Sequence, residues 1–541
     1  MEMHLATVWE SIADAIPDRP AITHGDTTRT WAEFDDRSAR FAAALTAAGL
    51  GPDTKVGLYL YNCNEYMEAH HGVLKMRGVA INVNYRYLDE ELRFLLENSD
   101  SEAVVFHTSL ADRVAKVVDR LPKLKLLVAV DDGPGRSVPG EQRYEDMLAA
   151  HAPMQRITRH EDDVYMLYTG GTTGMPKGVM YAIGGLTAGL AEAGFPLLGL
   201  EPVTDAAEIA PRVQALADAG GPSVSIPCAP LMHGTGCWLG WFMPMLGGGH
   251  IVTMTNRSLD AHEVLDAIER HRATAVTIVG DSFAKPLVRA IDEGRPDGGA
   301  YDLTSVQLID SSGVMWTAEV KNDMIERIPQ AVLVDAMGST EGSMGSQITA
   351  KGIPVETAKF VKGPNAKVFT DDDREVTPGS DEVGMVAAGG NVPLGYYKDE
   401  EKSARTFRVI DGVRYSFPGD FAQVAEDGTL ILLGRGSQVI NTGGEKVFPE
   451  EVEEAVKRVD GVFDCLVVGV DDEKFGQAVT AVASRLDDAN VDESTVIAAV
   501  KRDLAGYKAP KSVVFVDDVP RAPNGKADYR TARSLAEAAA S

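Results

Sequence analysis

The stretch Tyr168–Gly178 reads YTGGTTGMPKG and places four glycines, three threonines and one lysine within eleven residues. Glycine lets the backbone adopt left-handed angles and come close to a ligand. Successive backbone N–H groups in such a loop form a concave anion site, to which threonine hydroxyls add donors. The loop is not a G-x-x-x-x-G-K-[ST] motif, because Gly178 stands where that motif requires Ser or Thr after Lys177. A tight polar turn would not need three threonines and a lysine together, so we predict a triphosphate-binding loop made of Thr169, Gly170, Gly171, Thr172, Thr173, Gly174 and Lys177.

The composition is typical of a soluble globular protein and excludes several other classes. The chain has 541 residues, which is long enough for roughly three or four domain-sized units. Its formal net charge of −28 argues against nucleic acid or an anionic membrane as the main partner. The four cysteines form no C-x-x-C motif, and we find neither a signal peptide nor an apolar run long enough to span a membrane. We therefore expect a cytoplasmic protein without an integral membrane segment.

Short apolar runs alternate with helical segments along most of the chain. Thr30–Glu33 has the pattern of a capping box and should begin a helix. The strand-like runs of the large part of the chain lie at 55–60, 103–106, 126–130, 275–279, 306–309, 332–334, 383–388 and 421–433. The last hundred residues look separate, with a helix at 449–459 and strands at 463–470 and 513–516. This alternation predicts an α/β, multi-domain protein with mostly parallel sheets covered by helices.

The segment from 204 to 219 allows two interpretations. Ala206, Ile209, Val213 and Leu216 follow one another at helical spacing. An amphipathic helix that packs on the core explains this pattern. A wall or lid of a binding site would explain it as well.

A second polar motif, DAMGSTEG at Asp335–Gly342, follows the predicted strand at 332–334. Gly338 permits a tight turn, after which Thr340 offers a hydroxyl and Glu341 a carboxylate. Mg²⁺ prefers such oxygen ligands and often shares them with phosphate. Taken alone, however, the motif is also typical of a polar turn after a strand.

Taken in order, these and five further motifs resemble those of the adenylate-forming superfamily, which comprises acyl-CoA synthetases, adenylation domains and luciferases. The resemblance covers nearly the whole chain. The further motifs are PLMHGTG at Pro230–Gly236, SSGVMW at Ser311–Trp316, YSFPGD at Tyr415–Asp420, the long match from Gly434 to Glu453, and PRAPNGK at Pro520–Lys526.

The resemblance implies a role for each matching residue. Lys526, Thr340 and Glu341 would be catalytic: Lys526 would bridge the attacking carboxylate and the α-phosphate, Thr340 would contact phosphate, and Glu341 would hold Mg²⁺. Asp420 would bind the ribose hydroxyls and Arg435 ribose or phosphate. The remaining implied ligand-binding residues are Asp335, Gly338 and Ser339 for the nucleotide, Gly443 and Gly444 for the pantetheine arm of CoA, Gly313 and Gly338 for the nucleotide or the acid, and His233 for the acid. The chain departs from the family in Met337, which replaces a tyrosine, and in Ser437, which replaces the Asp or Lys of the hinge.

The resemblance also implies the architecture and the reaction. It predicts a large N-terminal domain at 1–434, built from two α/β subdomains and a small β-rich subdomain, a hinge at 435–437 and a small mobile α+β domain at 438–541. A carboxylic acid and MgATP would give an acyl-adenylate and pyrophosphate. After the small domain rotates, the thiol of coenzyme A would displace AMP. A homodimer is plausible by the same resemblance.

The substrate is less well defined by the sequence. The motifs YTGGTTG, GRGS and INTGGEKV are most similar to those of actinobacterial ligases for fatty or steroid side-chain acids. Trp238, Trp241, Phe242, Met243 and Phe283 fit either an apolar pocket or ordinary core. An enzyme that loads a carrier protein is one alternative. A degenerate ATP-binding scaffold is another, against which the retained Lys177, Glu341, Asp420, Arg435 and Lys526 argue.

Overall fold

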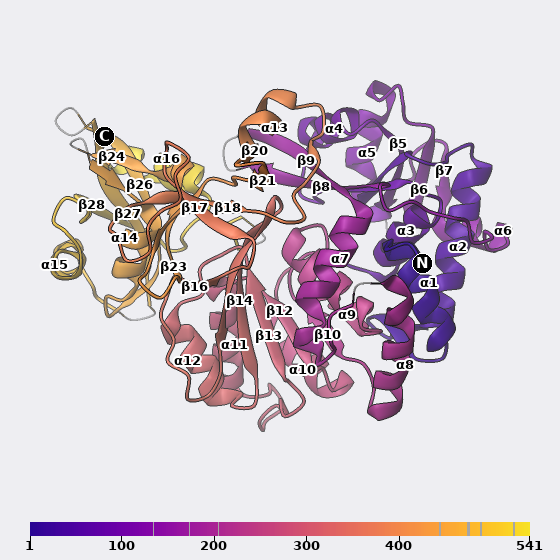
Figure 1. Ribbon diagram of the computed structural model, residues 1–541, viewed down its shortest axis with the longest axis horizontal. Helices are drawn as coiled ribbons and strands as arrows, with labels where there is room; N and C mark the ends of the chain where they lie inside the picture. The colour runs from indigo at the N-terminus through magenta and orange to yellow at the C-terminus, as the bar shows by residue number, and fades with distance from the viewer. Residues whose placement is uncertain are drawn as a thin grey trace.

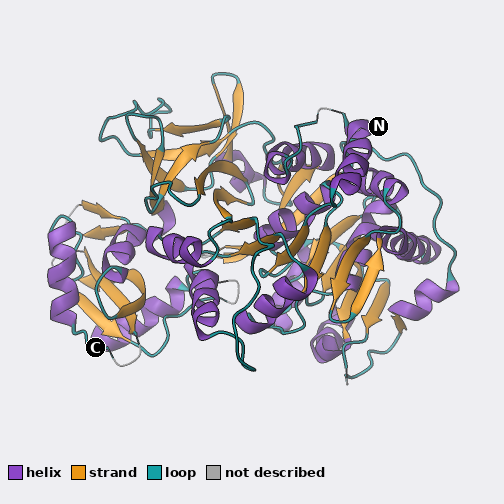
Figure 2. Cartoon of the chain, turned by 90° about the horizontal axis from the view of Figure 1, so that it is seen from below, coloured by secondary structure: helices purple, strands orange, loops and turns teal. Residues whose placement is uncertain are grey.

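The structure, a computed structural model, describes residues 1–133, 135–171, 174–203, 205–442, 445–472, 476–486, 489–522 and 525–540. A large body holds the N-terminus, and a smaller body with the C-terminus stands at one end of it (Figure 1). Seen from below, helices lie beside strands in both bodies (Figure 2). No described helix combines the length and the apolar character that crossing a membrane requires.

The first α/β unit is a five-stranded parallel sheet in the order β4–β3–β5–β6–β7. Its strands are β3 (Lys55–Tyr59), β4 (Val79–Asn82), β5 (Ser101–His107), β6 (Leu126–Val130) and β7 (Glu141–Arg143). Its helices are α2 (Trp31–Ala47), α3 (Asn64–Lys75), α4 (Asp89–Asn98), α5 (Ala111–Val117) and α6 (Tyr144–Ala150). Side chains alternate along β5, so Val104 packs with α4 and α5 while Val105 joins the core with α2 and α3. The predicted capping box at Thr30 and Glu33 begins α2.

The second unit is built on a larger sheet. A parallel run, β1–β11–β10–β12–β13–β14, continues through antiparallel strands β15, β16, β23 and β22. The strands of this run are β1 (Pro20–His24), β2 (Thr27–Thr30), β10 (Val224–Pro227), β11 (His250–Thr253), β12 (Ala275–Ile278), β13 (Leu308–Ser312), β14 (Val332–Ser339), β15 (Gly342–Thr349) and β16 (Lys359–Lys362). Helices α10 (Ala261–His271), α11 (Asp281–Glu293) and α12 (Ala318–Arg327) bury their apolar sides against it. The parallel strands end at one edge, where binding sites of such sheets form.

The predicted small β-rich subdomain is confirmed. It contains β17 (Ala366–Phe369), β18 (Gly384–Ala388), β20 (Phe407–Ile410), β21 (Val413–Ser416), β22 (Asp420–Val424) and β23 (Leu430–Arg435). Its core includes Met337, which is 5% exposed and packs with Phe360 and Val386. Met337 is thus a core side chain.

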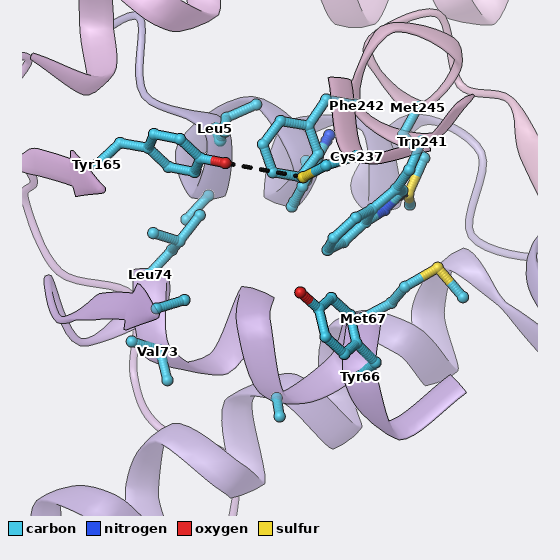
Figure 3. Close-up of a cluster of buried hydrophobic side chains, with 14 of the residues drawn as sticks. Leu5, Tyr66, Met67, Val73, Leu74, Tyr165, Cys237, Trp241, Phe242 and Met245 are labelled. Atoms are coloured by element: carbon cyan, nitrogen blue, oxygen red, sulfur yellow. Dashed lines mark hydrogen bonds between the residues drawn. The ribbon is translucent and has the colours of Figure 1, made fainter. Parts of the chain in front are cut away.

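Aromatic side chains fill the space between the two α/β units. The rings of Trp9, on α1 (Leu5–Ala15), and Trp241, on η5 (Thr235–Phe242), stack with centroids 5.8 Å apart. Phe242 and Tyr66 pack around them (Figure 3). Trp241 and Phe242 are fully buried, so they belong to the core. The same core holds α9 (Met243–Leu246) and α7 (Ile183–Gly194).

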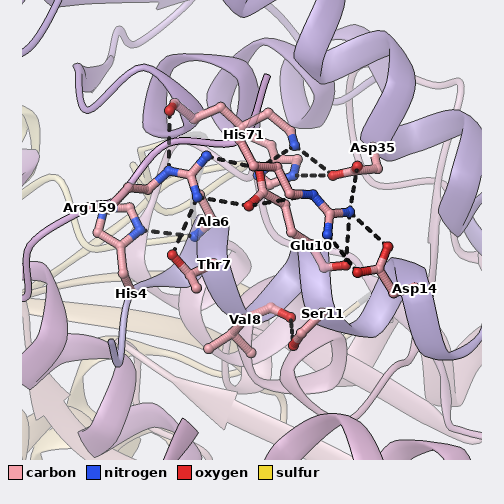
Figure 4. Close-up of polar contacts among 12 residues, drawn as sticks. His4, Ala6, Thr7, Val8, Glu10, Ser11, Asp14, Asp35, His71 and Arg159 are labelled. Carbon is pink, nitrogen blue, oxygen red and sulfur yellow. Dashed lines mark hydrogen bonds and ion pairs between the residues drawn. The ribbon is translucent and has the colours of Figure 1, made fainter. Parts of the chain in front are cut away.

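A buried charge cluster ties α1 to α2 and α3 (Figure 4). The Lys75 ammonium lies 2.7 Å from the Glu10 carboxylate and 2.6 Å from that of Asp35. The Arg159 guanidinium donates to both oxygens of Glu10 at 2.8 Å. Buried charges require such partners, so the cluster fixes the N-terminal helix to the first unit.

The described part of the segment at 204–219 forms η4 (Ala206–Glu208) and α8 (Ile209–Ala219), and η3 (Pro196–Leu198) precedes it. Helix α8 buries Ile209, Val213 and Ala217 in the core shared with α1. The structure therefore favours the interpretation of this segment as a helix that packs on the core.

The C-terminal domain has its own sheet, in the order β25–β24–β27–β26 with β28 beside β27. Its strands are β24 (Ile440–Thr442), β25 (Glu445–Val447), β26 (Val462–Asp472), β27 (Gly476–Arg485) and β28 (Ser512–Phe515). Its helices are α14 (Pro449–Lys457), α15 (Glu493–Asp503) and α16 (Tyr529–Ala540). The separate core confirms that the last hundred residues form a unit of their own.

Candidate functional site

The predicted phosphate loop is the turn of an antiparallel hairpin. Strands β8 (Val164–Gly171) and β9 (Gly174–Ala182) pair with Thr169 opposite Lys177. Thr172 and Thr173 lie outside the described residues, whereas Gly170 and Gly171 belong to β8 and Gly174 begins β9. Asn82, at the end of β4, holds the base of the loop. Its amide accepts from the Tyr168 N–H at 2.6 Å and donates to the carbonyls of Tyr168 and Met232 at 2.7 and 2.6 Å.

Tyr396 connects this loop with Glu341. Strand β19 (Gly395–Tyr396) pairs with β9, which places Tyr396 opposite Val179. The Tyr396 hydroxyl donates to Glu341 Oε1 at 2.7 Å. The Lys177 ammonium lies 5.8 Å from the centroid of the Tyr396 ring and 3.9 Å from Asp399 Oδ2. Two of the sequence motifs therefore meet at Tyr396, a residue that no motif had identified.

The DAMGSTEG motif forms the β14–β15 hairpin, with Thr340 and Glu341 at its turn. The Glu341 N–H donates to Ser339 Oγ at 3.1 Å, and the Thr340 carbonyl accepts from the Tyr181 hydroxyl at 2.9 Å. These bonds present Glu341 on a rigid turn, two residues beyond Ser339 and three beyond Gly338. Asp335 is differently engaged. It is buried on β14 and pairs with the Lys321 ammonium at 2.7 Å.

Glu341 fits a metal ion that is bound together with a nucleotide. Within the part of the chain that the structure describes, no group of three or more His, Cys, Asp or Glu side chains is arranged to hold a metal ion. Mg²⁺ keeps several waters and commonly takes one or two carboxylates plus substrate phosphates. A single carboxylate beside a phosphate loop suits that mode of binding.

Asp420 and Arg435 face each other across neighbouring strands of the small subdomain. The register of β22 and β23 pairs the two residues, and Arg435 Nε lies 3.3 Å from Asp420 Oδ1. Burial raises the pKa of the Asp420 carboxyl, and the Arg435 charge opposes this rise. Asp420 Oδ2 is buried and accepts no hydrogen bond from any described residue. Since buried oxygens normally have a donor, this oxygen suits a ligand that carries hydroxyl groups.

The connection to the C-terminal domain follows Arg435 directly. Strand β23 ends at Arg435, a short 3-10 turn covers Gly436–Gln438, and β24 of the next sheet begins at Ile440. The Arg435 N–H donates to Glu450 Oε1 of α14 at 3.2 Å. Burial raises the pKa of the Glu450 carboxyl to about 7. Gly443 and Gly444 lie outside the described residues.

Lys526 reaches from the C-terminal domain into the edge of the large sheet. A Cβ atom at Gly313, after β13, would lie 3.5 Å from Lys526 Cε and 3.6 Å from Thr235 Oγ1. The Lys526 side chain remains partly exposed to solvent. The protein packed around it lowers its pKa by desolvation, and the Arg435 charge lowers it further, while Glu341 and Asp420 oppose the shift. Lys526 is therefore close enough to Arg435, Glu341 and Asp420 to feel all three charges.

His233 lies near enough to Lys526 for the lysine charge to act on its imidazole. The backbone N–H of His233 donates to the Pro230 carbonyl at 3.0 Å, and the backbone carbonyl of His233 accepts from the Cys237 N–H at 2.8 Å. Burial, followed by the charges of Lys526 and Arg86, lowers the pKa of His233 to about 3. The imidazole is thus neutral near pH 7, which suits a wall of a binding site better than a cationic contact.

Contacts between α11 and the C-terminal domain hold Lys526 in this position. The Lys285 ammonium donates to the Phe463 carbonyl at 2.8 Å and lies 5.2 Å from the centroid of its ring. The Arg289 guanidinium lies 6.0 Å from the same ring. Gly525, with a φ of +76°, packs so closely that a Cβ there would lie 2.3 Å from Ser282 Oγ.

A cavity of about 560 Å³ adjoins the Lys526 loop. It is bordered by both α/β units and the C-terminal domain through Tyr61, Arg86, Cys228, Arg257, Phe283 and Gly525. Its volume is within the range of small-molecule sites, about 300 to 1,000 Å³. The cavity thus offers room for a ligand next to the meeting point of the motifs.

Known proteins are similar to this chain along most of its length. Residues 9–397 match the AMP-binding enzyme family, and residues 451–526 match its C-terminal domain. The chain is 39% identical to the 3-oxocholest-4-en-26-oate–CoA ligase of Rhodococcus rhodochrous over 98% of this chain and 96% of that protein. It is 40% identical to a medium/long-chain-fatty-acid–CoA/3-oxocholest-4-en-26-oate–CoA ligase of Mycobacterium tuberculosis over 99% of this chain and 96% of that one.

Solved structures of more distant proteins share the fold. The anthranilate CoA ligase AuaEII in complex with anthranoyl-AMP aligns with a TM-score of 0.84 at 21% identity, over 99% of this chain and 98% of that one. A benzoate CoA ligase from Burkholderia xenovorans aligns with a TM-score of 0.81 at 21% identity, over 98% and 99%. The family match over most of the chain and the relatives at 39 and 40% identity show that the chain belongs to the AMP-binding enzyme family.

Proposed function

We propose that the protein is an ATP-dependent, AMP-forming acyl-CoA ligase. The observation that carries this proposal is that Lys526 of the C-terminal domain lies against Gly313 at the edge of the large sheet, within reach of the charges of Arg435, Glu341 and Asp420. These residues come from two domains and supply a cation, a metal ligand and a ribose acceptor at one place. The near full-length identity with CoA ligases supports the same reaction.

In the first step a carboxylate oxygen of the acid attacks the α-phosphorus of ATP. The bond from that phosphorus to the bridging oxygen breaks, and pyrophosphate leaves with both bonding electrons. Lys526 offsets the negative charge that gathers between the carboxylate and the α-phosphate. Asp420 orients the ribose, and Arg435 binds ribose or phosphate beside it. A Mg²⁺ ion bound with ATP would be held by Glu341 and would neutralise charge on the phosphates.

In the second step the thiol of coenzyme A attacks the acyl carbon of the adenylate, a thioester forms and AMP leaves. Because AMP is a good leaving group in a mixed anhydride, no covalent enzyme nucleophile is required. Lys526 lies beside Gly313, which is its position in the first step of the proposed reaction. For the second step the domain at 438–541 rotates about residues 435–437, which withdraws Lys526 from the domain at 1–434 and brings in the loop with Gly443 and Gly444.

The acid is an apolar monocarboxylate, either a steroid side-chain acid or a medium- or long-chain fatty acid. The relatives at 39 to 40% identity carry these substrates in their names. A cytoplasmic location is part of the proposal, and the four free cysteines suit a reducing compartment. Transfer of the acyl group to a carrier protein in place of CoA is the alternative, which the acceptor test below separates.

The test measures AMP and thioester formation from MgATP and CoA across steroid side-chain acids, aryl acids and short-, medium- and long-chain fatty acids. We expect equal amounts of AMP and thioester with the steroid or the longer fatty acids. Adenylate that accumulates without thioester in the presence of CoA would overturn the CoA assignment and favour a carrier-protein acceptor. Absence of both products with every acid would overturn the ligase.

A further inference from the structure

Two lysines lie over the same tyrosine ring at the rim of the phosphate loop. The ammonium of Lys402 lies 5.0 Å from the centroid of the Tyr396 ring, and that of Lys177 lies 5.8 Å from it. Lys177 belongs to β9, whereas Lys402 belongs to α13 (Glu400–Thr406). The two cations therefore come from segments far apart in the sequence, and the pairing of β19 with β9 brings them together.

The backbone around Lys402 fixes this position. Asp399 caps α13, because its Oδ1 accepts the Lys402 N–H at 3.1 Å. The Ser403 hydroxyl, one residue further on, donates to the Asp399 carbonyl at 2.6 Å, and it accepts the Tyr396 N–H at 2.8 Å. Lys402 thus stands on a turn that is bonded to Tyr396 itself.

The two lysines differ in their carboxylate neighbours. Lys177 has the Asp399 carboxylate at 3.9 Å. Lys402 makes no ion pair within 4.0 Å with any carboxylate of the described ranges. Burial and the neighbouring Lys177 lower the pKa of Lys402 to about 8, while Glu341 and Asp399 oppose the shift. Two ammonium groups that both lie within 6 Å of one ring centroid repel each other, and an anion bound by both would offset that repulsion.

Glu341 connects this cation pair with the rest of the site. Its carboxylate accepts the Tyr396 hydroxyl at 2.7 Å, and its charge acts on Lys402 as well as on Lys526. Lys526 and Arg435 serve the α-phosphate and the ribose in the proposed reaction. Lys177 stands opposite Thr169 in the β8–β9 pair, so the cation pair lies at the loop that is predicted to bind the triphosphate.

We infer that Lys402 is a second phosphate-binding residue, which together with Lys177 binds the β- and γ-phosphates of ATP and the pyrophosphate product. The inference rests on the proposed function and adds a residue to it. When the bond from the α-phosphorus to the bridging oxygen breaks, pyrophosphate takes both electrons and gains negative charge. A second cation therefore stabilises the leaving group. The residue contributes nothing to the second step, from which pyrophosphate is absent.

The experiment compares Lys402→Met and Lys402→Arg with the wild type in two assays. ATP–pyrophosphate exchange reports the first step, and thioester formation from CoA and supplied acyl-adenylate reports the second. Lys402→Met should raise the KM for ATP and the inhibition constant of pyrophosphate by about tenfold, the effect of one charged hydrogen bond. Lys402→Arg should restore both constants to within about threefold, and the thioester step should be unchanged in both variants.

Arg405→Met is the matched control, since it removes one positive charge from the exposed side of the same helix. It should leave both constants as in the wild type. Exchange in Lys402→Met equal to that of the wild type would overturn this inference alone. Equal loss of both steps without recovery in Lys402→Arg would also overturn it, because it would make Lys402 a structural residue. A wild-type protein without any exchange would overturn the proposed function as well.

Discussion

Replacing Lys285 by methionine should slow the first half of the reaction and spare the second. Lys285 stands on α11 of the large domain, and its ammonium binds the carbonyl and the ring of Phe463 in the C-terminal domain. Methionine keeps most of the apolar stem but removes the charge. The state in which Lys526 lies beside Gly313 loses this contact, and we expect the rotated state of the proposed reaction to lack the contact already in the wild type.

The size of the effect follows from the two contacts. A hydrogen bond from a charged donor contributes about 1.5 kcal/mol, and a partly exposed cation–π contact about 0.5 kcal/mol. Their sum of about 2 kcal/mol corresponds to a change of about 30-fold in the docking equilibrium. Phe463→Ala keeps the carbonyl and removes only the ring, which Arg289 also contacts, so about 1 kcal/mol or about fivefold is expected.

The assay measures ATP–pyrophosphate exchange and thioester formation from supplied adenylate, each for the wild type and the two variants. We expect the ratio of the two rates to fall by about 30-fold in Lys285→Met and about fivefold in Phe463→Ala. Lys501→Met, on the exposed side of α15, is the control and should leave the ratio unchanged. An unchanged ratio in Lys285→Met, or a larger effect of Phe463→Ala, would refute the reasoning.

Three further predictions concern other parts of the molecule. Lys526→Ala should reduce adenylate formation by at least about 100-fold and spare thioester formation from supplied adenylate; equal losses in both assays would remove Lys526 from its role. Lys75→Met should lower the free energy of unfolding by about 3 kcal/mol in urea titrations, because Glu10 and Asp35 lose their shared cation; a change below about 1 kcal/mol would contradict this. Burial raises the pKa of Glu453 from 4.5 to about 8, so its stabilising contribution is complete below pH 4.5 and is lost as the pH rises through 8. Glu453→Gln should therefore flatten the loss of stability between pH 5 and pH 8, and parallel profiles of variant and wild type would be inconsistent with it.

The local sequence predicted the fold well where strands and helices have clear apolar patterns. The runs at 55–60, 126–130 and 275–279 correspond to β3, β6 and β12 within one residue at each end. The strand predicted at 332–334 continues to Ser339, because its polar second half pairs with β15 in a hairpin. That extension depends on the neighbouring strand and not on apolar character.

The candidate site was only partly accessible to such reasoning. The ordered motifs indicated Lys177, Glu341, Asp420 and Lys526, but not the residues that connect them. Tyr396 and Lys402 lie at the site because β19 pairs with β9, and Asn82 because β4 ends beside the phosphate loop. Such contacts between distant segments have no signature in the local pattern. The ion pair of Asp335 with Lys321 could not be predicted from the local sequence either, because it depends on the packing of α12.

The most direct test of the central claim follows an oxygen atom. The acid is labelled with ¹⁸O in both carboxylate positions and is incubated with MgATP, CoA and the protein. Attack of the carboxylate on the α-phosphorus predicts that one labelled oxygen appears in AMP, the other stays in the thioester, and pyrophosphate remains unlabelled. Label in pyrophosphate or in inorganic phosphate, or AMP without label, would contradict an acyl-adenylate and with it the assignment of the site.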